Sequence, residues 1–315
     1  MASRLLPAPL ILLTLLAASG LGAVMAADAW AYGKPGPGTR LAGCPVLPRS
    51  NPFNRDISKA RVHPLSNRYI ASIGRASMLH ADFGSGRWGN YGIPFRVVGR
   101  AQKRVPVLFT AFGSESDRGP YPIPLNSRIE GGSDDHVIAL QRGTCRLYEL
   151  YRARRGKGRW LADSGARFNL RSNRLRPAGW TSADAAGLPI LPGLARAGEA
   201  SRGRITHALR VTVSATQRGY IHPARHFASS STDRSRPPMG LRLRLKAGYR
   251  LNRFSGQSLA IMRALKKYGL IVADNGSDMF ISGTPDRRWN DDVLDQLKTV
   301  PARAFQAVST GRIHR

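Results

Sequence analysis

Acidic residues and cysteines are scarce in this sequence. Its 315 residues include 19 Asp and Glu against 49 Lys and Arg, which leaves a formal net charge of +30. The two cysteines lack a CxxC spacing or clustered histidines, so a thiolate zinc site is not indicated. Zinc-finger, helix-turn-helix and RNA-recognition patterns are absent, as is the GxSxG elbow of serine hydrolases. We therefore expect no cofactor, no metal and no specific nucleic-acid partner.

Only one long apolar run is present, and it lies at the N-terminus. Arg4 precedes the leucine-rich residues 5–16, and small residues follow up to Ala26. This order predicts a cleaved signal peptide over residues 1–26. The run is interrupted by prolines and is shorter than the roughly 20 residues of a spanning helix. We therefore expect a periplasmic or extracellular protein with no transmembrane segment in the mature chain.

The two cysteines, Cys44 and Cys145, both follow the expected cleavage site. In an oxidising compartment such a pair favours a disulfide, which here would close a loop of roughly 100 residues. Residues 41–44 also match the residue types of a lipoprotein cleavage box. A polar, Gly- and Pro-rich stretch separates that box from the apolar run, which argues against lipidation.

Short alternating segments separated by Gly, Pro and Asn predict a mostly β fold, an antiparallel sandwich or jelly-roll-like architecture with one wet face. We expect a flexible leader over residues 27–50, a single β-rich domain over residues 51–309 and a tail over residues 310–315. The strands are expected at residues 93–98, 105–109, 136–140, 146–151, 205–213 and 241–246. In the last of these, Arg242, Arg244 and Lys246 alternate with leucines and would form an exposed basic face.

Helices are expected mainly in the C-terminal third. Residues 258–268 carry apolar side chains at helical spacing and are followed by Gly269, a typical helix stop. Asn290 is expected to cap a second short helix. Between them, residues 270–276 and 279–281 read as a strand pair joined by an Asn-Gly turn. Thr181 or Ser182 would begin a capped helical turn.

Several segments resemble a family of secreted, mainly bacterial proteins of unestablished activity. The resemblance rests on ESDRGPYPIP (115–124), RPAGWTSADAAGLPILPG (176–193), PPMGLR (237–242) and ADNGS (273–277), together with NPFN (51–54), HPLS (63–66) and CRLYEL (145–150). It spans essentially the whole mature chain. One departure is the NPFN segment, where the relatives carry an Ile-Trp-Asn sequence. The resemblance implies secretion and a shared fold, and it transfers no catalytic residue.

Carboxylates, histidines and a tyrosine supply the candidate chemistry. Glu115 and Asp117 share one loop, and glycoside hydrolases use a pair of carboxylates as acid and as nucleophile or base. Glu149 is a possible partner for either of them. Histidine and tyrosine beside arginine would serve a lyase, which removes a proton next to a carboxylate. The candidate catalytic residues are therefore Glu115, Asp117, His136, His207, Tyr220 and His226. The acids have a structural alternative as turn caps or arginine partners, and an inward histidine as a hydrogen-bonded core residue, which is the preferred reading for His207.

Two other residue classes give weaker signals of a functional role. The histidines with Asp134 or Asp135 show no HxH or HxxxH spacing, so they give little support for a metal site. Trp88, Trp160, Trp180 and Trp289, with Tyr121 and Tyr148, would either stack on sugars or pack in the core.

Two functions follow from these observations. The first is a secreted protein that acts on or binds extracellular polysaccharide, as a lyase or glycoside hydrolase for an acidic glycan if it is an enzyme. The alternative is a non-catalytic envelope or matrix protein that binds polyanions through arginine-rich faces. The excess of positive charge favours acidic polysaccharide or another extracellular polyanion as the partner in both cases.

Overall fold

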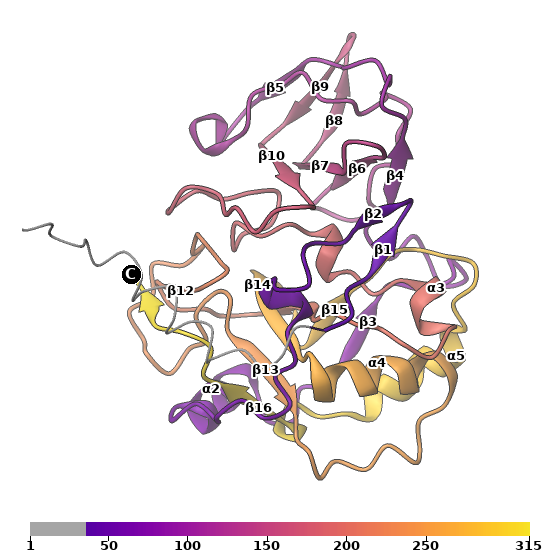
Figure 1. The fold of residues 1–315 in the computed structure, drawn as a ribbon. Helices are drawn as coiled ribbons and strands as arrows, with labels where there is room; N and C mark the ends of the chain where they lie inside the picture. Colours follow the sequence, from indigo (N-terminus) through magenta and orange to yellow (C-terminus); the bar gives the residue numbers. More distant parts are fainter. Residues whose placement is uncertain (1–35) are drawn as a thin grey trace, which may run out of the picture.

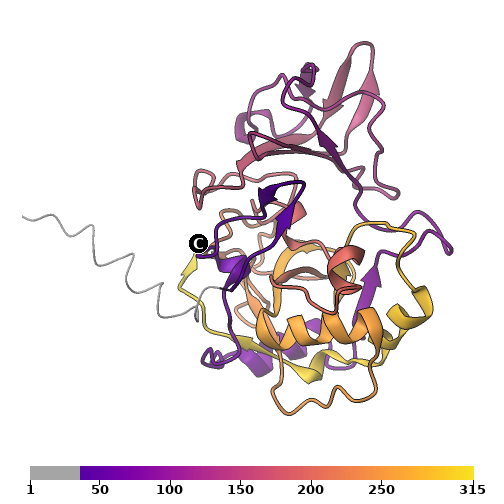
Figure 2. The same ribbon diagram turned by 45° about the vertical axis from the view of Figure 1, so that its right-hand side comes forward.

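The structure, a computed structural model, describes residues 36–315. The expected signal peptide and the first part of the expected leader lie outside these residues. Figure 1 shows the chain arranged in two parts, with strands β4 to β10 at one end and the helices with the remaining strands at the other. The same division is visible after a turn of 45° (Figure 2).

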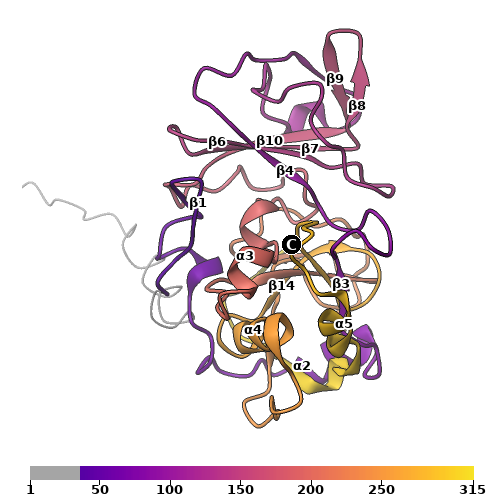
Figure 3. The same cartoon turned by 90° about the vertical axis from the view of Figure 1, so that its right-hand side faces the viewer.

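A four-stranded and a three-stranded sheet form the first part. The four-stranded order is β10 (Ser164–Asn169), β7 (Arg146–Tyr151), β6 (Val137–Gln141) and β4 (Phe95–Val98). The three-stranded order is β5 (Val107–Phe109), β9 (Arg159–Ala162) and β8 (Arg154–Gly156). Figure 3 shows the larger sheet edge-on, between the β8–β9 hairpin and the helices. One face of it packs with Trp160 in a small core, and the other with the main core.

A six-stranded sheet organises the second part. Its order is β16 (Phe305–Val308), β13 (Arg242–Leu245), β14 (Leu270–Asn275), β11 (Leu209–Val213), β15 (Phe280–Ser282) and β3 (His80–Asp82). Two small pairs complete the strands: β1 (Arg40–Leu41) with β2 (Cys44–Pro45), and β12 (Tyr220–Ile221) with β17 (Ile313–His314). The prediction of a mostly β protein is confirmed. Antiparallel pairs predominate, while β11–β14, β15–β3, β4–β6 and β5–β9 are parallel.

The helices are short and are not confined to the C-terminal third. They are α2 (Ser66–Ile73), α3 (Ala197–Ala200), α4 (Gly256–Lys267) and α5 (Asp291–Leu294), with 3-10 turns at Pro52–Asn54, Gly113–Glu115, Leu191–Gly193, Asp295–Thr299 and Ala302–Ala304. As predicted, Gly269 ends the α4 region with a positive φ, and the Asn290 side chain accepts from the Val293 amide to cap α5. Helix α2 was missed, although Tyr69, Ile70 and Ile73 mark its buried face. No helix within residues 36–315 is long and apolar enough to cross a membrane.

The expected exposed arginine face of β13 is buried, which corrects the prediction. Arg242 is 0% exposed, and its guanidinium donates to the carbonyls of Pro52 and Tyr268. Arg244 donates to Ile57 O, Ser58 O and Ala60 O at 2.7–3.0 Å. The reason is that β13 is an interior strand and that the segment 52–60 covers this side of it. Lys246, the third residue of the expected basic face, lies beyond the end of β13 and is exposed.

Two local predictions were also wrong. Strands β14 and β15 do not form a hairpin, because β11 lies between them in the sheet and pairs with both. Residues 181–187 are not helical. There Ser182 Oγ accepts from the Asp184 amide and donates to Leu188 O, while Asp184 Oδ1 accepts from the Ala186 amide. Side chains that bond the neighbouring backbone in this way favour turns over helix.

The ends of the described chain are more ordered than expected. Residues 40–45 form the β1–β2 hairpin, and Val46 is buried, so the expected leader does not extend to residue 50. Near the C-terminus, Ile313 and His314 pair with β12 in place of a free tail. The predicted disulfide between Cys44 and Cys145 is present. It ties the β1–β2 hairpin to the start of β7, across the boundary between the two parts.

Candidate functional site

An arginine-lined cavity lies at the β10 edge of the four-stranded sheet. Strands β7 and β10 are antiparallel, with Arg146 opposite Asn169 and Tyr148 opposite Arg167. Opposed residues share a face, so Arg146 and Arg167 project from the same side. Both side chains are exposed, because this end of the sheet extends beyond Tyr148 and the small core that packs on the same face.

The chain that follows β10 completes the cavity. It turns back past the sheet edge and places Arg174, Arg176 and Trp180 beside Phe168. Arg176 is buried and held by three bonds: to Asp117 Oδ2 at 2.5 Å, to Glu115 O at 2.5 Å and to Thr181 O at 2.7 Å. Its guanidinium carbon lies 5.8 Å from the Phe168 ring centre and 5.5 Å from that of Trp180. Arg176 is therefore a fixed part of the wall.

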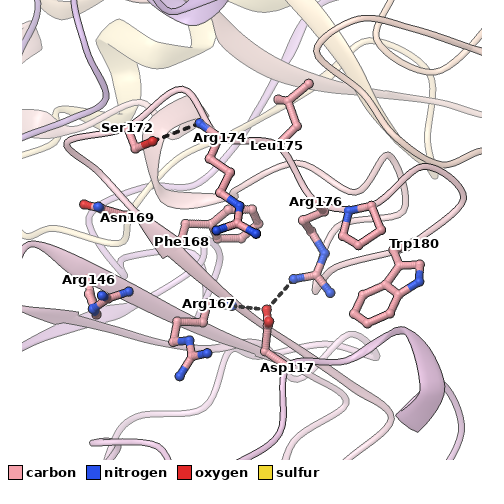
Figure 4. Close-up of a pocket in the computed structure, with 11 residues that line it drawn as sticks. Asp117, Arg146, Arg167, Phe168, Asn169, Ser172, Arg174, Leu175, Arg176 and Trp180 are labelled. Carbon is pink, nitrogen blue, oxygen red and sulfur yellow. Dashed lines mark hydrogen bonds and ion pairs between the residues drawn. The ribbon is translucent and has the colours of Figure 1, made fainter.

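The cavity is open and strongly basic. It has a volume of about 590 Å³, and four of its lining residues are arginines, whereas Asp117 is the one carboxylate. Figure 4 shows Asp117 between Arg167 and Arg176, with Trp180 beside Arg176 and Arg174 over Phe168. The guanidinium groups of Arg146, Arg167 and Arg174 make no ion pair or hydrogen bond with any residue in 36–315. Three charged donors are thus available to an anionic ligand.

Of the predicted catalytic residues, Asp117 lines this cavity and Glu115 lies directly behind it. Asp117 Oδ2 accepts from the Arg167 amide at 2.8 Å as well as from Arg176. Glu115 Oε2 accepts from the Thr181 amide at 2.9 Å. Both carboxylates are engaged with the wall, which corresponds to the structural alternative of turn capping and arginine pairing.

His136 directly precedes β6 and is buried, and it does not line the cavity. Its Nε2 donates to Ala183 O at 2.8 Å, and its Nδ1 bonds the carboxylate of Glu130. Burial lowers the pKa of His136, but the charge and hydrogen bond of Glu130 outweigh this and raise the pKa to about 9. With a hydrogen-bond acceptor at each nitrogen, the ring is a fixed imidazolium.

The other predicted residues lie in separate surroundings. His207 is buried against Arg196 and Glu199, with Nδ1 donating to Ala208 O at 2.8 Å. Tyr220 is buried in β12 and stacks on the ring of His314. His226 is partly buried and donates from Nδ1 to Ala185 O at 2.7 Å. None of these three lines the arginine cavity.

Several of these contacts converge on one turn, residues 181–186, within the tryptophan-containing motif. Each residue of this turn bonds a different element. The partners in order are Glu115 for Thr181, Ser164 for Ser182, His136 for Ala183, Arg210 for Asp184, His226 for Ala185 and Ala273 for Ala186. The turn thereby joins the four-stranded and six-stranded sheets. His136 and His226 act here as donors to backbone carbonyls, which is a structural role.

Ion pairs of the buried Arg210 support the same turn. Arg210 bonds Asp184 Oδ2 at 3.1 Å, Asp274 Oδ2 at 3.4 Å and Ser282 Oγ at 2.7 Å. Burial raises the pKa of Asp274 to about 7, helped by the charge of Asp184 and opposed by Arg210. Glu149 is fully buried and accepts from the Ile190 and Leu191 amides, and burial raises its pKa to about 7. These carboxylates hold the interface between the two sheets together.

Sequence reasoning did not single out the cavity residues Arg146, Arg174 and Arg176. The available signal was the density of arginines between residues 167 and 176, next to Phe168 and Trp180. The tryptophans differ in burial. Trp160 and Trp289 are buried, Trp180 lines the cavity, and Trp88 is exposed. In residues 36–315, no group of three or more His, Cys, Asp or Glu side chains is placed to hold a metal ion.

Comparisons with protein-family models, curated proteins and solved structures found no match to this chain. The site must therefore be interpreted from its own geometry.

Proposed function

We propose that this protein is a periplasmic or extracellular binder of acidic polysaccharide and that the arginine cavity is its binding site. The observation that carries the proposal is the set of three exposed guanidinium groups, Arg146, Arg167 and Arg174, without carboxylate partners around one cavity. A guanidinium offers paired donors that match a carboxylate or sulfate. Phe168 and Trp180 add apolar surface against which a sugar ring can pack.

The choice of polysaccharide rests on the compartment and on the shape of the site. The N-terminal sequence and the disulfide both fit an oxidising, extracytoplasmic location. Acidic polysaccharides are among the polyanions found on that side of the membrane. A cavity with four arginines and two aromatic rings also provides directional contacts beyond the general attraction of a protein with a net charge of +30.

Binding without cleavage is the better supported function. Glycan cleavage by a lyase or hydrolase needs a general acid and base within reach of the substrate. The carboxylate in the cavity, Asp117, is held by Arg176 and the Arg167 amide, and the predicted histidines bond backbone carbonyls elsewhere. We therefore favour the non-catalytic alternative. The binding residues are those of the arginine cavity and not the arginines of β13 that the sequence suggested.

The test compares two double variants with the same change in net charge. Arg146→Gln with Arg167→Gln removes two cavity guanidiniums. Arg154→Gln with Arg159→Gln removes two exposed arginines from the β8–β9 hairpin, outside the cavity. Affinity for alginate, polygalacturonate and hyaluronan is measured by calorimetry over a series of salt concentrations. We expect a loss of about tenfold in the first double variant, equivalent to about 1.4 kcal/mol, and little change in the second.

Three results would contradict the proposal. Equal losses in both double variants would show attraction to the overall charge with no role for the cavity. Tighter binding to DNA of matched length than to every glycan would identify a nucleic acid as the ligand. Release of unsaturated products that absorb in the ultraviolet would show a lyase and would overturn the non-catalytic reading.

A further inference from the structure

A second cavity differs in character from the basic surface around it. It has a volume of about 270 Å³ and lies between the loop 83–91 and the segment that begins at α5. Aromatic side chains form much of its wall, and its charged lining residues are Asp291, Asp295 and Lys298. The aromatic lining residues are His80, Phe83, Trp88 and Tyr91. An aromatic wall with a few polar groups is typical of a small-molecule site.

Two of these aromatic side chains are unusually exposed. Trp88 is 65% exposed and Tyr91 is 56% exposed, more than any other large hydrophobic side chain in residues 36–315. Both line the same cavity, while the next most exposed aromatic residue, Phe112 at 44%, lines neither this cavity nor the arginine cavity. Leaving two large rings in water beside one cavity indicates a surface that a ligand covers.

The loop that carries these rings is held in place by specific contacts. Asp291 accepts from the Ser85 amide at 2.8 Å and from the Ser85 hydroxyl at 2.6 Å. Gly84 allows this approach, because a Cβ at that position would lie 2.8 Å from Asp291 Oδ1. At the far end, Arg128 donates to Asn90 Oδ1 at 2.7 Å. The loop that carries both rings is thus held in place before a ligand binds, which reduces the entropy cost of binding.

The charges around the cavity decide which ligand fits. Arg87 lies 4.6 Å from the Trp88 ring centre and 3.7 Å from Asp292, and Lys298 pairs with Asp295 at 2.6 Å. A cationic ligand would meet Arg87, Lys298 and a protein of net charge +30. An anionic ligand would meet Asp291 and Asp295. An uncharged ligand with hydroxyl groups avoids both penalties, because carboxylate oxygens accept and the ammonium donates to its hydroxyls.

We propose that this second cavity binds the ring of an uncharged sugar residue, with Trp88 and Tyr91 as the stacking surface. The apolar C–H face of a pyranose ring suits an exposed aromatic face, and its hydroxyls suit Asp291, Asp295 and Lys298. The inference stands apart from the proposed function, because it uses different residues and a ligand without charge. The two sites would allow the protein to hold neutral and acidic sugars at separate positions.

The experiment titrates the purified full chain with cellotetraose, maltotetraose and chitotetraose, each at low and high salt. Binding is followed by calorimetry and by tryptophan fluorescence. We expect one or more of these sugars to bind with an affinity that is independent of salt. Trp88→Ala and Tyr91→Ala should each weaken that binding at least tenfold. Phe112→Ala is the matched control, because it removes an exposed aromatic ring outside both cavities and should have no effect.

The outcomes separate this inference from the arginine site. Arg146→Gln with Arg167→Gln should leave binding of the uncharged sugars unchanged, so that the failure of one site does not imply failure of the other. Absence of binding across all three tetrasaccharides would overturn the inference. It would also be overturned if binding survived Trp88→Ala, or if choline or lysine bound in a Trp88-dependent manner and no sugar did. Because both rings are exposed, the variants should fold as the parent does, and circular dichroism checks this.

Discussion

Individual arginine side chains have two distinct roles in this protein, and burial separates them. Arg196, Arg210 and Arg242 are buried and donate to backbone carbonyls or to buried carboxylates. Arg146 and Arg167 are exposed on β7 and β10, and their guanidinium groups make no ion pair or hydrogen bond with residues 36–315. A buried guanidinium must be satisfied inside the protein, whereas an exposed one remains available to a ligand. The count of arginines therefore overstates the surface available for binding polyanions.

The His136–Glu130 pair predicts a dependence of stability on pH. Because the folded pKa of His136 is about 9, above the ordinary value of 6.5, its contribution is fully present below pH 6.5 and is lost as the pH rises through 9. Glu130→Gln removes the negative charge that raises the pKa of His136. The burial of His136 remains, so its pKa falls. We expect the variant to lose about 3 kcal/mol at pH 6 and much less at pH 9.5, as measured by urea unfolding.

The control for this prediction is Asp233→Asn, which removes a carboxylate from an exposed ion pair with Arg236. It should change the free energy of unfolding only slightly at either pH, because exposed pairs contribute little. A Glu130→Gln variant whose deficit stays constant from pH 6 to 9.5 would show that His136 does not carry the charge assigned to it.

At the scale of the element, β13 shows how a strand with alternating polar residues can lie in the interior of a sheet. On an exposed strand face, these guanidinium groups would be hydrated. Here Arg242 and Arg244 donate instead to carbonyls of the segment 52–60 and of Tyr268. The segment 52–60 has few backbone partners in strands, so the two arginines act as its anchors to the sheet. An alternating sequence shows that a strand has a polar and an apolar face. It does not show whether water or another segment of the protein covers the polar face.

This arrangement predicts that Arg242→Met destabilises the protein without changing the arginine cavity. Loss of the charged donor leaves Pro52 O and Tyr268 O without that bond, and each such bond contributes about 1.5–3 kcal/mol. We expect the free energy of unfolding to fall by about 3 kcal/mol in urea titrations. Affinity for acidic polysaccharide, measured on the folded protein, should match the parent. A loss of affinity with unchanged stability would instead support the exposed basic face originally expected for β13.

For the whole molecule, the disulfide adds a covalent cross-link between the two parts of the fold to the links that the backbone itself makes. Cys44 and Cys145 are separated by 101 residues and are both buried in the main core. A cross-link of this span restricts the unfolded chain strongly, by about 4–5 kcal/mol in the loop-entropy estimate. A protein that carries 49 basic and 19 acidic residues also repels itself when compact, which makes such a constraint useful.

We therefore expect the double variant Cys44→Ala with Cys145→Ala to lose about 3–5 kcal/mol of unfolding free energy in urea titrations. Reducing agent should destabilise the parent by a similar amount and should leave the variant unaffected. Equal stability of the parent and the variant under oxidising conditions would show that packing alone holds the β1–β2 hairpin against β7.

The secondary structure was largely predictable because its causes are local. Residues 146–151 match β7, as their local alternation of side chains predicted. Gly269 ends the α4 region and Asn290 caps α5, each through contacts within a few positions of the chain. The β14–β15 hairpin was wrong because strand pairing is not local, and β11 enters between the two strands. The candidate site was predicted least well, since Arg146 and Arg176 meet only through the β7–β10 register and the return of the chain past the sheet edge.

The sequence by itself determined the β-rich character, the disulfide partners and the large positive charge. These depend on composition, on alternation and on the presence of only two cysteines. Only the tertiary structure decided which charges are available. It buried Arg242 under the segment 52–60, used His136 and His226 to hold the turn 181–186, and left Arg146, Arg167 and Arg174 around one cavity. The physical reason is that burial and pairing depend on segments distant in the chain, which no local pattern records.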